Sequence, residues 1–252
     1  AQQYNAINLA QGFPNFEIDA VLQNCLIEAS GSNAHQYAPM PGTLELREQI
    51  VALVAKQYNR TLDPNEVLVT AGATQAIFTA IQALVHQGQE VLILDPSYDC
   101  YEAPVLLTGA QPIRIPLGLD FRPNWEQIRA AITSNTRLLI TNNPHNPSGT
   151  IWAPKDFEQL ESIMQDFPGL LLLSDEVYEF ITFENKHISI NTRQKLKDRS
   201  LIVSSFGKTL HLTGWKIGYL IAPEILLNEV KKVHQYLVFS VNSLAQAAIN
   251  EY

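Results

Sequence analysis

Short apolar runs alternate with helix-like segments along most of the chain, and this alternation restricts the folds open to it. Buried strands are predicted where runs of leucine, isoleucine and valine end at turn residues, over residues 67–70, 91–94, 138–141, 170–173 and 201–203. Helices are predicted between such runs, over residues 42–58, 75–85 and 155–166. Strands and helices that alternate in this way form mostly parallel sheets with helices on both faces. We therefore expect an α/β fold, in which a mostly parallel sheet is the middle layer of a three-layer α/β/α domain.

Residues capable of chemistry follow almost every predicted strand. In open α/β sheets, ligands bind in the crevice beyond the carboxyl ends of the strands. We therefore expect the following residues to converge on one site: Gly72, Ala73, Thr74, Tyr98, Asn146, Asp175, Tyr178, Ser205 and Lys208.

The charge balance and the cysteines argue against several classes of function. The net charge of −8 disfavours nucleic acid and anionic membranes as partners, because both need a positive protein surface. No apolar run reaches the ~18 residues of a membrane span. Cys25 and Cys100 lie far apart, without the spacing of a disulfide framework or a zinc site. We therefore expect no metal and a reducing, cytoplasmic location.

The turn Gly72-Ala73-Thr74 joins a predicted strand to a predicted helix. Its free backbone N–H groups, its hydroxyl and the positive end of the helix dipole suit a phosphate group, although such turns also occur for packing reasons alone. The turn is neither a Walker A loop nor a complete GxGxxG, so a nucleotide-binding site is not favoured.

Asp175 ends an apolar strand, so its carboxylate is expected to be partly buried and to need a partner. It is either a helix cap or part of a structural ion pair, or it is the counter-charge of a cationic ring nitrogen, with the phenol of Tyr178 within one turn. Lys208 follows another apolar strand. It is either an exposed lysine or, in a desolvated site close to other cations, a Schiff-base nucleophile. Further along the chain, Lys216 offers a second cation for a phosphate.

Seven motifs, in order along the chain, carry a resemblance to a known family. They are Asn-Leu-Ala-Gln-Gly-Phe-Pro (8–14), Gln-Tyr-Ala-Pro-Met-Pro-Gly (36–42), Ala-Gly-Ala-Thr-Gln-Ala (71–76), Asp-Pro-Ser-Tyr-Asp-Cys-Tyr (95–101), Asn-Asn-Pro-His-Asn-Pro-Ser-Gly (142–149), Ser-Asp-Glu-Val-Tyr (174–178) and Ser-Ser-Phe-Gly-Lys-Thr (204–209). From about residue 7 to its end, the chain resembles the fold-type-I aminotransferases, which depend on pyridoxal 5'-phosphate (PLP). Within that family it most resembles the methionine aminotransferase and kynurenine aminotransferase (glutamine transaminase K) branch. The resemblance implies the PLP-dependent transferase-like fold.

The resemblance implies catalytic roles for three residues. Lys208 matches the lysine that holds the cofactor as a Schiff base and then moves a proton between the substrate α-carbon and the cofactor. Asp175 matches the aspartate that keeps the pyridine nitrogen protonated, so that the ring can act as an electron sink. Tyr178, together with Asn146, matches the pair that hydrogen-bonds the phenolate oxygen of the cofactor.

The resemblance also implies the remaining contacts of cofactor and substrate. Tyr98 matches the aromatic residue stacked on the cofactor ring, and Gly12 and Asn146 match residues that bind the substrate. Tyr37 matches a tyrosine that reaches the phosphate from the neighbouring subunit, which implies a homodimer with shared sites. The phosphate group is bound in the family by residues that match Ala73, Thr74, Ser205 and Lys216.

Two features depart from the family pattern. Many relatives carry arginine in place of Lys216, and a lysine keeps the positive charge but not the bidentate geometry. The family's carboxylate-binding arginine lies in a segment that would follow Tyr252. We therefore expect a fragment, in which residues 1–18 are an N-terminal segment associated with the small domain and residues 19–252 are the PLP-binding large domain. The C-terminal small domain is then largely absent and incomplete in this chain.

The predicted reaction is transamination between an L-amino acid and a 2-oxo acid. Residues 234–242, which correspond to the segment that supplies an arginine for dicarboxylic substrates, contain no arginine and are largely aromatic and aliphatic. Because an unpaired carboxylate there would be costly, we expect methionine, phenylalanine or tyrosine as the donor, with kynurenine and glutamine as further candidates. Two alternatives stay open: a PLP-dependent carbon–sulfur β-lyase, and a non-catalytic PLP-binding regulatory domain.

Overall fold

A computed structural model describes residues 2–7, 16–184 and 186–252 of the chain, so the first motif, with Gly12, lies outside the described residues. The strands are β1 Val67–Thr70, β2 Glu90–Asp95, β3 Gln111–Pro116, β4 Thr136–Asn142, β5 Leu171–Asp175, β6 Ser200–Ser205 and β7 Gly218–Ile221. The helices are α1 Ala20–Ser30, α2 Leu44–Tyr58, α3 Ala73–Leu84, α4 Glu102–Leu107, α5 Trp125–Ala131, α6 Pro154–Asp166, α7 Phe206–Thr209, α8 Glu224–Leu237 and α9 Ser243–Glu251. Short 3₁₀ turns cover Gln2–Tyr4, Pro64–Glu66, Ile190–Thr192, Lys197–Arg199 and Thr213–Trp215.

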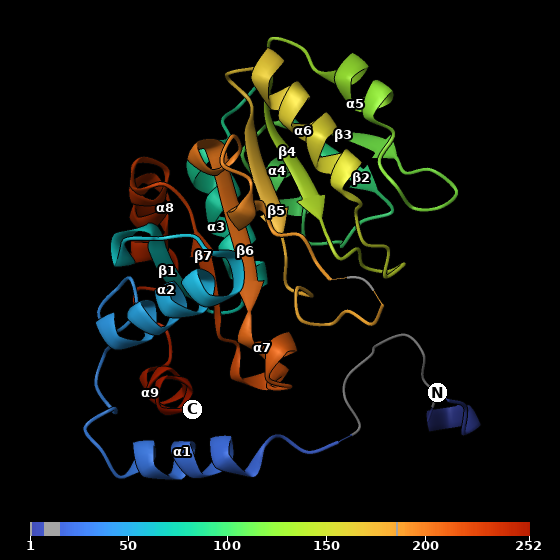
Figure 1. The fold of residues 1–252 in the computed structure, drawn as a ribbon. Coiled ribbons are helices and arrows are strands. Elements are labelled where there is room, and N and C mark those ends of the chain that lie inside the picture. The colour runs from blue at the N-terminus through green and yellow to red at the C-terminus, as the bar shows by residue number, and fades with distance from the viewer. Residues whose placement is uncertain (1, 8–15, 185) are drawn as a thin grey trace.

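The strands form one sheet in the order β1-β7-β6-β5-β4-β2-β3, with helices packed around it (Figure 1). The strands from β3 to β6 in this order run parallel to their neighbours, whereas β7 runs antiparallel to both β1 and β6. The prediction of an α/β fold with a mostly parallel sheet is therefore confirmed, and the antiparallel strand β7 makes the sheet a mixed one.

Successive strand residues enter two hydrophobic cores, one on each face of the sheet. Leu139 and Leu172 belong to the core that α2, α5 and α6 cover. Their chain neighbours Leu138 and Leu173 belong to the opposite core, which α3, α4 and α8 cover. Burial on both faces explains why these strands are continuously apolar rather than alternating. The arrangement is the expected three-layer one.

The observed start of α3 matters for the site. Gly72 precedes the helix with a φ of 79°, a left-handed conformation that glycine adopts without the steric cost of a Cβ. The helix therefore begins at Ala73, two residues earlier than predicted. As a result, Ala73 and Thr74 lie in the first helical turn, where backbone N–H groups have no partner within the helix.

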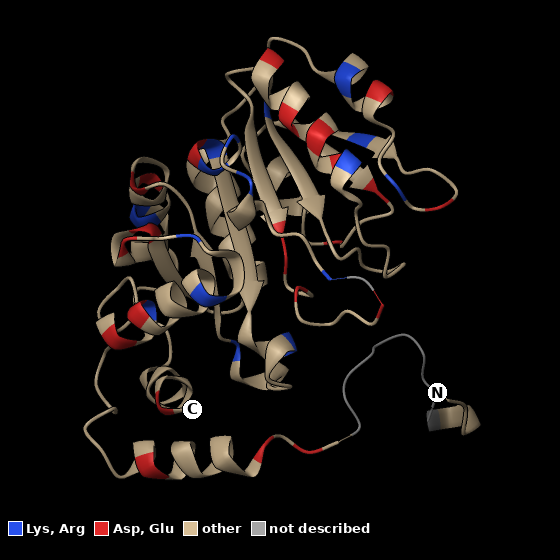
Figure 2. Cartoon of the chain, viewed as in Figure 1, with Lys and Arg blue, Asp and Glu red and all other residues tan. Residues whose placement is uncertain are grey.

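Charged side chains lie mainly on the helices and loops that surround the sheet (Figure 2). Among residues 2–7, 16–184 and 186–252, no helix is long and apolar enough to cross a membrane.

Candidate active site

A cavity of about 870 Å³ lies at the carboxyl ends of β4, β5 and β6 and at the start of α3. Ten of the residues predicted for the site line it: Gly72, Ala73, Thr74, Tyr98, Asn146, Asp175, Tyr178, Ser205, Lys208 and Lys216. Other residues in its wall were not singled out from the sequence as site residues: Asn142, Val177, Ile181, Gly207, His211, Thr213, Gly214 and Ile217. The structure thus places most of the predicted residues around one space.

One end of this cavity is suited to an anion. Ala73 and Thr74 present the N-terminus of the 12-residue helix α3, with its unpaired N–H groups and positive dipole end. The ammonium group of Lys216 lies beside the same turn, since a Cβ built on Gly72 would be 3.5 Å from Lys216 Nζ. Ser205 ends β6 in the same wall, and its Oγ accepts a hydrogen bond of 3.2 Å from the Gly207 N–H. A helix N-terminus, a hydroxyl and a lysine are the donors that a phosphate group needs.

Asp175 provides a buried acid at another part of the wall. Its side chain is only 3% exposed, and burial raises its pKa to about 6. Two hydrogen bonds act in the opposite direction: Tyr101 Oη donates to Oδ2 at 2.7 Å, and the Val177 N–H donates to Oδ1 at 3.2 Å. Within the described part of the chain, no lysine, arginine or histidine forms an ion pair with Asp175. A buried carboxylate with donors but without a cation fits a ligand that brings its own positive group.

Lys208 and Tyr178 face each other in the wall, with Lys208 Nζ 5.6 Å from the centre of the Tyr178 ring. Burial raises the pKa of the Tyr178 phenol, and the Asp175 charge acts in the same direction, so the hydroxyl stays protonated and can donate. Asn146 is held in place because its backbone N–H donates to Asn142 Oδ1 at 2.7 Å. These groups supply an amine, a phenol and an amide around the same space.

One of the predicted residues, Tyr37, is not brought to the cavity. Tyr37 is 82% exposed and is absent from the cavity wall; its ring lies edge-on to Phe239, with 5.4 Å between ring centres. This placement leaves the Tyr37 hydroxyl free to meet another molecule rather than its own site. Gly12 lies outside the described residues.

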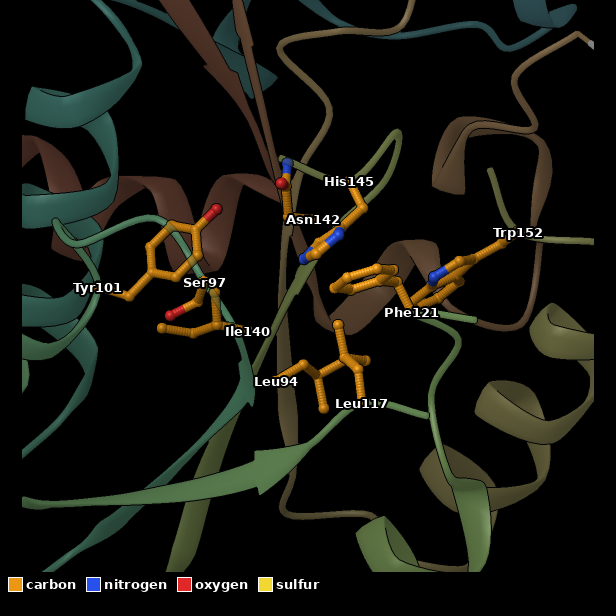
Figure 3. Close-up of a pocket in the computed structure, with 9 residues that line it drawn as sticks. All are labelled: Leu94, Ser97, Tyr101, Leu117, Phe121, Ile140, Asn142, His145 and Trp152. Atoms are coloured by element: carbon orange, nitrogen blue, oxygen red, sulfur yellow. The ribbon is translucent and has the colours of Figure 1, made fainter. Parts of the chain in front are cut away.

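A second, much smaller cavity of about 10 Å³ adjoins the site and has room for about one water molecule. Figure 3 shows Tyr101 and Ser97 on one side of it and Phe121 and Trp152 on the other, with Asn142 and His145 between them. His145 Nε2 donates to the Pro96 carbonyl at 2.9 Å, and burial lowers the His145 pKa, which favours the neutral imidazole. Asn142 lines both cavities, so the small one lies directly behind the wall of the large one.

Sequence reasoning missed two residues that hold the site together. Tyr101 donates to Asp175 from a position 74 residues away in the chain. Asn142 ends β4, donates through Nδ2 to the Asp175 carbonyl at 3.0 Å and accepts from the Asn146 N–H. Both belong to the motifs named above, but their contacts with Asp175 form only when the strands pair and α4 packs against the sheet.

Comparisons with known proteins identify relatives along the whole chain. The family model for aminotransferase class I and II matches residues 4–251. Methionine aminotransferase of Escherichia coli (strain K12) is 45% identical over 99% of this chain and 65% of its own length, and kynurenine–oxoglutarate transaminase of Dictyostelium discoideum is 33% identical over 99% and 62%. The chain therefore spans somewhat less than two thirds of these relatives.

Solved structures are similar over the same extent. YbdL from Escherichia coli, described as having a methionine aminotransferase function, superposes with a TM-score of 0.96 at 45% identity over 99% of this chain and 67% of its own. N-succinyldiaminopimelate aminotransferase from Mycobacterium tuberculosis superposes with a TM-score of 0.95 at 34% identity over 99% and 66%.

Proposed function

We propose that this chain, which belongs to the aminotransferase class I and II family, is the cofactor-binding part of a transaminase that acts on neutral or aromatic amino acids and a 2-oxo acid. The family match confirms the resemblance inferred from the seven sequence motifs. Members of this family use PLP. When bound, this cofactor supplies an electron sink for negative charge at the substrate α-carbon.

The observation that carries the proposal is the pairing of two sites in one cavity wall. The α3 N-terminus and Lys216 form an anion site, and Asp175 is a buried acid without a cationic partner among the described residues. PLP has a phosphate at one end and a basic ring nitrogen, so these two features fit its two charged ends. The amine of Lys208, in the same wall, fits the aldehyde.

Each residue then has a role that its contacts support. When the cofactor is bound, Lys208 would hold it through its amine, and the same amine would move a proton at the substrate α-carbon. Asp175 would keep the proton on the ring nitrogen of the cofactor, and Tyr98 would cover the face of the ring. Tyr178 and Asn146, which both line the cavity, would donate hydrogen bonds to the phenolate oxygen of the cofactor, and Asn146 would also contact the substrate. Asp175, Lys208 and Tyr178 would thus each act on a different group of the cofactor or the substrate.

The donor is proposed to be a neutral amino acid such as methionine, phenylalanine or tyrosine, with kynurenine and glutamine as further candidates. Residues 234–242 carry no arginine, and Tyr236 and Phe239 from this segment are exposed at the surface. Two relatives, a methionine aminotransferase and a kynurenine–oxoglutarate transaminase, support the same classes of substrate and favour transamination over β-elimination.

A homodimer with shared sites is also proposed. Two hydrogen bonds hold the loop that carries Tyr37 in place. Ser240 Oγ donates to the Ala38 carbonyl at 2.9 Å, and Ser243 Oγ donates to the Gln36 carbonyl at 2.6 Å. A rigid loop that presents an exposed tyrosine beside Phe239 is suited to contact a second subunit, because ordered exposed aromatics are typical of interfaces.

The expected domain division and location are proposals as well. Residues 19–252 are assigned to the PLP-binding large domain and residues 1–18 to a segment associated with the small domain. Cys25 and Cys100 are both free thiols, which supports a reducing, cytoplasmic location.

The experiment that tests the function is reduction of the cofactor adduct with borohydride in the full-length protein, followed by peptide mapping. The label is expected on Lys208 and should disappear in Lys208→Ala, whereas Lys232→Ala, an exposed lysine paired with Glu229, should keep it. Adduct formation at another lysine would refute the assignment.

A panel of amino donors tests the reaction. Methionine and phenylalanine should have a higher kcat/KM than aspartate; the reverse order would overturn the substrate class. Release of pyruvate and ammonia from a cysteine S-conjugate at a rate above transamination would identify a β-lyase instead.

Subunit mixing tests the dimer. A Tyr37→Phe variant mixed with an inactive Lys208→Ala variant should form hybrid dimers in which one site carries both defects and the other neither. Kinetics equal to the sum of two separate populations would rule out shared sites.

A further inference from the structure

Tyr101 is a buried tyrosine directly behind the wall of the large cavity. It is 2% exposed, lies in the core that α3, α4 and α8 cover, and lines the small cavity but not the large one. It therefore does not touch the space assigned to the cofactor. A buried phenol needs a hydrogen-bond partner, and the Tyr101 hydroxyl finds it in Asp175 Oδ2 at 2.7 Å.

The direction of this hydrogen bond is fixed. Burial and the nearby Asp175 charge raise the Tyr101 pKa well above its ordinary value, so the phenol remains protonated and donates. The Val177 N–H donates to the other carboxylate oxygen at 3.2 Å. With one donor on each oxygen, the plane of the Asp175 carboxylate can no longer rotate freely, although this torsion is otherwise soft. The lone pairs that remain are thus held in one orientation.

The ring of Tyr101 makes a second contact with the site. It meets the ring of Tyr98 edge-on, with 6.0 Å between ring centres and 90° between the planes. This is a favourable geometry for two aromatic rings. Tyr98 lines the large cavity, and its ring is the one expected to cover the cofactor. This ring therefore packs against Tyr101, a residue buried in the core.

We propose that Tyr101 is a positioning residue that acts on both partners of the cofactor ring, through its hydroxyl on Asp175 and through its ring edge on Tyr98. The inference rests on the proposed function. In this role the Tyr101 hydroxyl keeps the Asp175 carboxylate ionised and in one orientation, and the Tyr101 ring keeps the Tyr98 side chain in place in the cavity wall.

The other groups around Asp175 do not share this task. Glu176 is adjacent and raises the Asp175 pKa, and Cys100 and Tyr178 lie close enough for the Asp175 charge to raise their own pKa values. None of these three donates a hydrogen bond to the carboxylate; among the described residues, Tyr101 is the one side chain that does. Its hydroxyl is therefore the side-chain group that stabilises the charged form of Asp175.

The test compares Tyr101→Phe with Tyr219→Phe in the PLP-loaded, full-length enzyme. Tyr219 is a matched control, because it is also buried and donates to a buried carboxylate, Glu179 Oε1 at 3.2 Å, but that carboxylate, unlike Asp175, does not line the large cavity. Tyr101→Phe should lower kcat by about 10–100-fold, the range for a lost hydrogen bond to a charged group, with KM for the amino donor changed less than ~3-fold. Tyr219→Phe should leave kcat within ~2-fold.

The pH profile separates positioning from a loss of structure. The ionised form of Asp175 is the active one, and the Tyr101 bond lowers its pKa, so removal of the bond raises that pKa. The acid limb of the kcat–pH profile of Tyr101→Phe should therefore move to higher pH by about one unit, with activity partly recovered in alkaline buffer. A purely structural role would lower kcat equally at every pH.

A third variant isolates the ring contact. Tyr101→Leu removes the edge-on support of Tyr98 as well, so PLP should dissociate more readily than from Tyr101→Phe, by roughly 2–10-fold. A Tyr101→Phe profile that coincides with that of Tyr219→Phe would overturn the proposal. Failure of the unmodified enzyme to form the Lys208 adduct would instead refute the proposed function, so the two failures are distinguishable.

Discussion

Replacement of Asp175 by asparagine is expected to stop catalysis while leaving the fold in place. Asparagine has nearly the same shape, and its carbonyl oxygen can accept from the Val177 N–H. Its amide can then donate to Tyr101 Oη, because the phenol is able to rotate and accept. Both buried polar groups keep partners, so the loss of stability should be limited to about 1 kcal/mol.

The catalytic loss follows from the charge. With about 4 Å between the two charges, and with the effective dielectric constant of about 20 that suits buried sites, a carboxylate and a protonated ring nitrogen would attract each other by ~4 kcal/mol. A neutral amide forfeits this attraction, and the ring nitrogen loses its proton. The expected decrease in kcat is ~10³-fold, within the range of ~10²–10⁴ for a lost acid or base.

The assay measures kcat, the PLP dissociation constant and the thermal midpoint of the same preparation. Glu176→Gln is the matched control, because Glu176 is the adjacent buried carboxylate and does not line the large cavity. It should lower the thermal midpoint but change kcat by less than ~10-fold. Transamination by Asp175→Asn at more than about a tenth of the normal rate would refute the electron-sink role of Asp175.

Two further predictions concern stability. In Gly218→Ala the new Cβ would lie 2.8 Å from the Ser204 carbonyl oxygen and 3.0 Å from the Gly72 carbonyl carbon. The free energy of unfolding should therefore fall by ~1–3 kcal/mol, and a titration should show weaker PLP binding. The control Gly169→Ala, whose new Cβ would have no atom within 4 Å, should show neither effect. Burial raises the pKa of Glu179 above its unfolded value of about 4.3, so its stabilising contribution is complete below that pH and is lost as pH rises through the folded pKa. Denaturation at several pH values should show that the free energy of unfolding of the unmodified protein falls relative to that of Glu179→Gln as the pH rises over this range. A difference between the two proteins that stays constant with pH would refute the raised pKa of Glu179.

The parts of the fold that the sequence predicted are those with two buried faces. β4, β5 and β6 are runs of leucine, isoleucine and valine that end in polar residues, so both their existence and the position of Asp175 at a strand end could be inferred. β3 was not predicted, because it is an edge strand that contains two prolines and is exposed at several positions. β7 escaped because it has only four residues and begins with glycine.

The candidate site was predictable to the extent that its residues lie at strand ends. Ser205 ends β6, Lys208 follows it, and Thr74 follows β1, so their convergence could be inferred from the arrangement of the sheet. Tyr101 carried no such signal, because it lies in a helix-like segment and meets Asp175 through the packing of α4 against the sheet. Contacts of this kind depend on side-chain packing between layers, which periodicity does not encode.

Two adjacent buried acids, Asp175 and Glu176, show what the structure adds to the motif. Consecutive residues at a strand end point to opposite faces, so only one of them can border the cavity. Glu176, 1% exposed, accepts from Ser174 Oγ at 3.0 Å, the Ile190 N–H at 3.0 Å and His187 Nε2 at 2.8 Å, and is thereby satisfied within the protein. Asp175 borders the cavity, and its carboxylate accepts two hydrogen bonds from the residues that the structure describes.

The contrast assigns different tasks to the two carboxylates. A carboxylate with three donors, one of them an imidazole, has little capacity left for a ligand, and it ties the end of β5 to the segment around Ile190. Glu179 does the same for β6, since it accepts from Ser204, Tyr58 and Tyr219. Glu176 and Glu179, with their hydrogen bonds complete within the protein, hold the strand ends in place. The Asp175 carboxylate therefore keeps its position beside the cavity, where a cationic ring nitrogen would complete its hydrogen bonding.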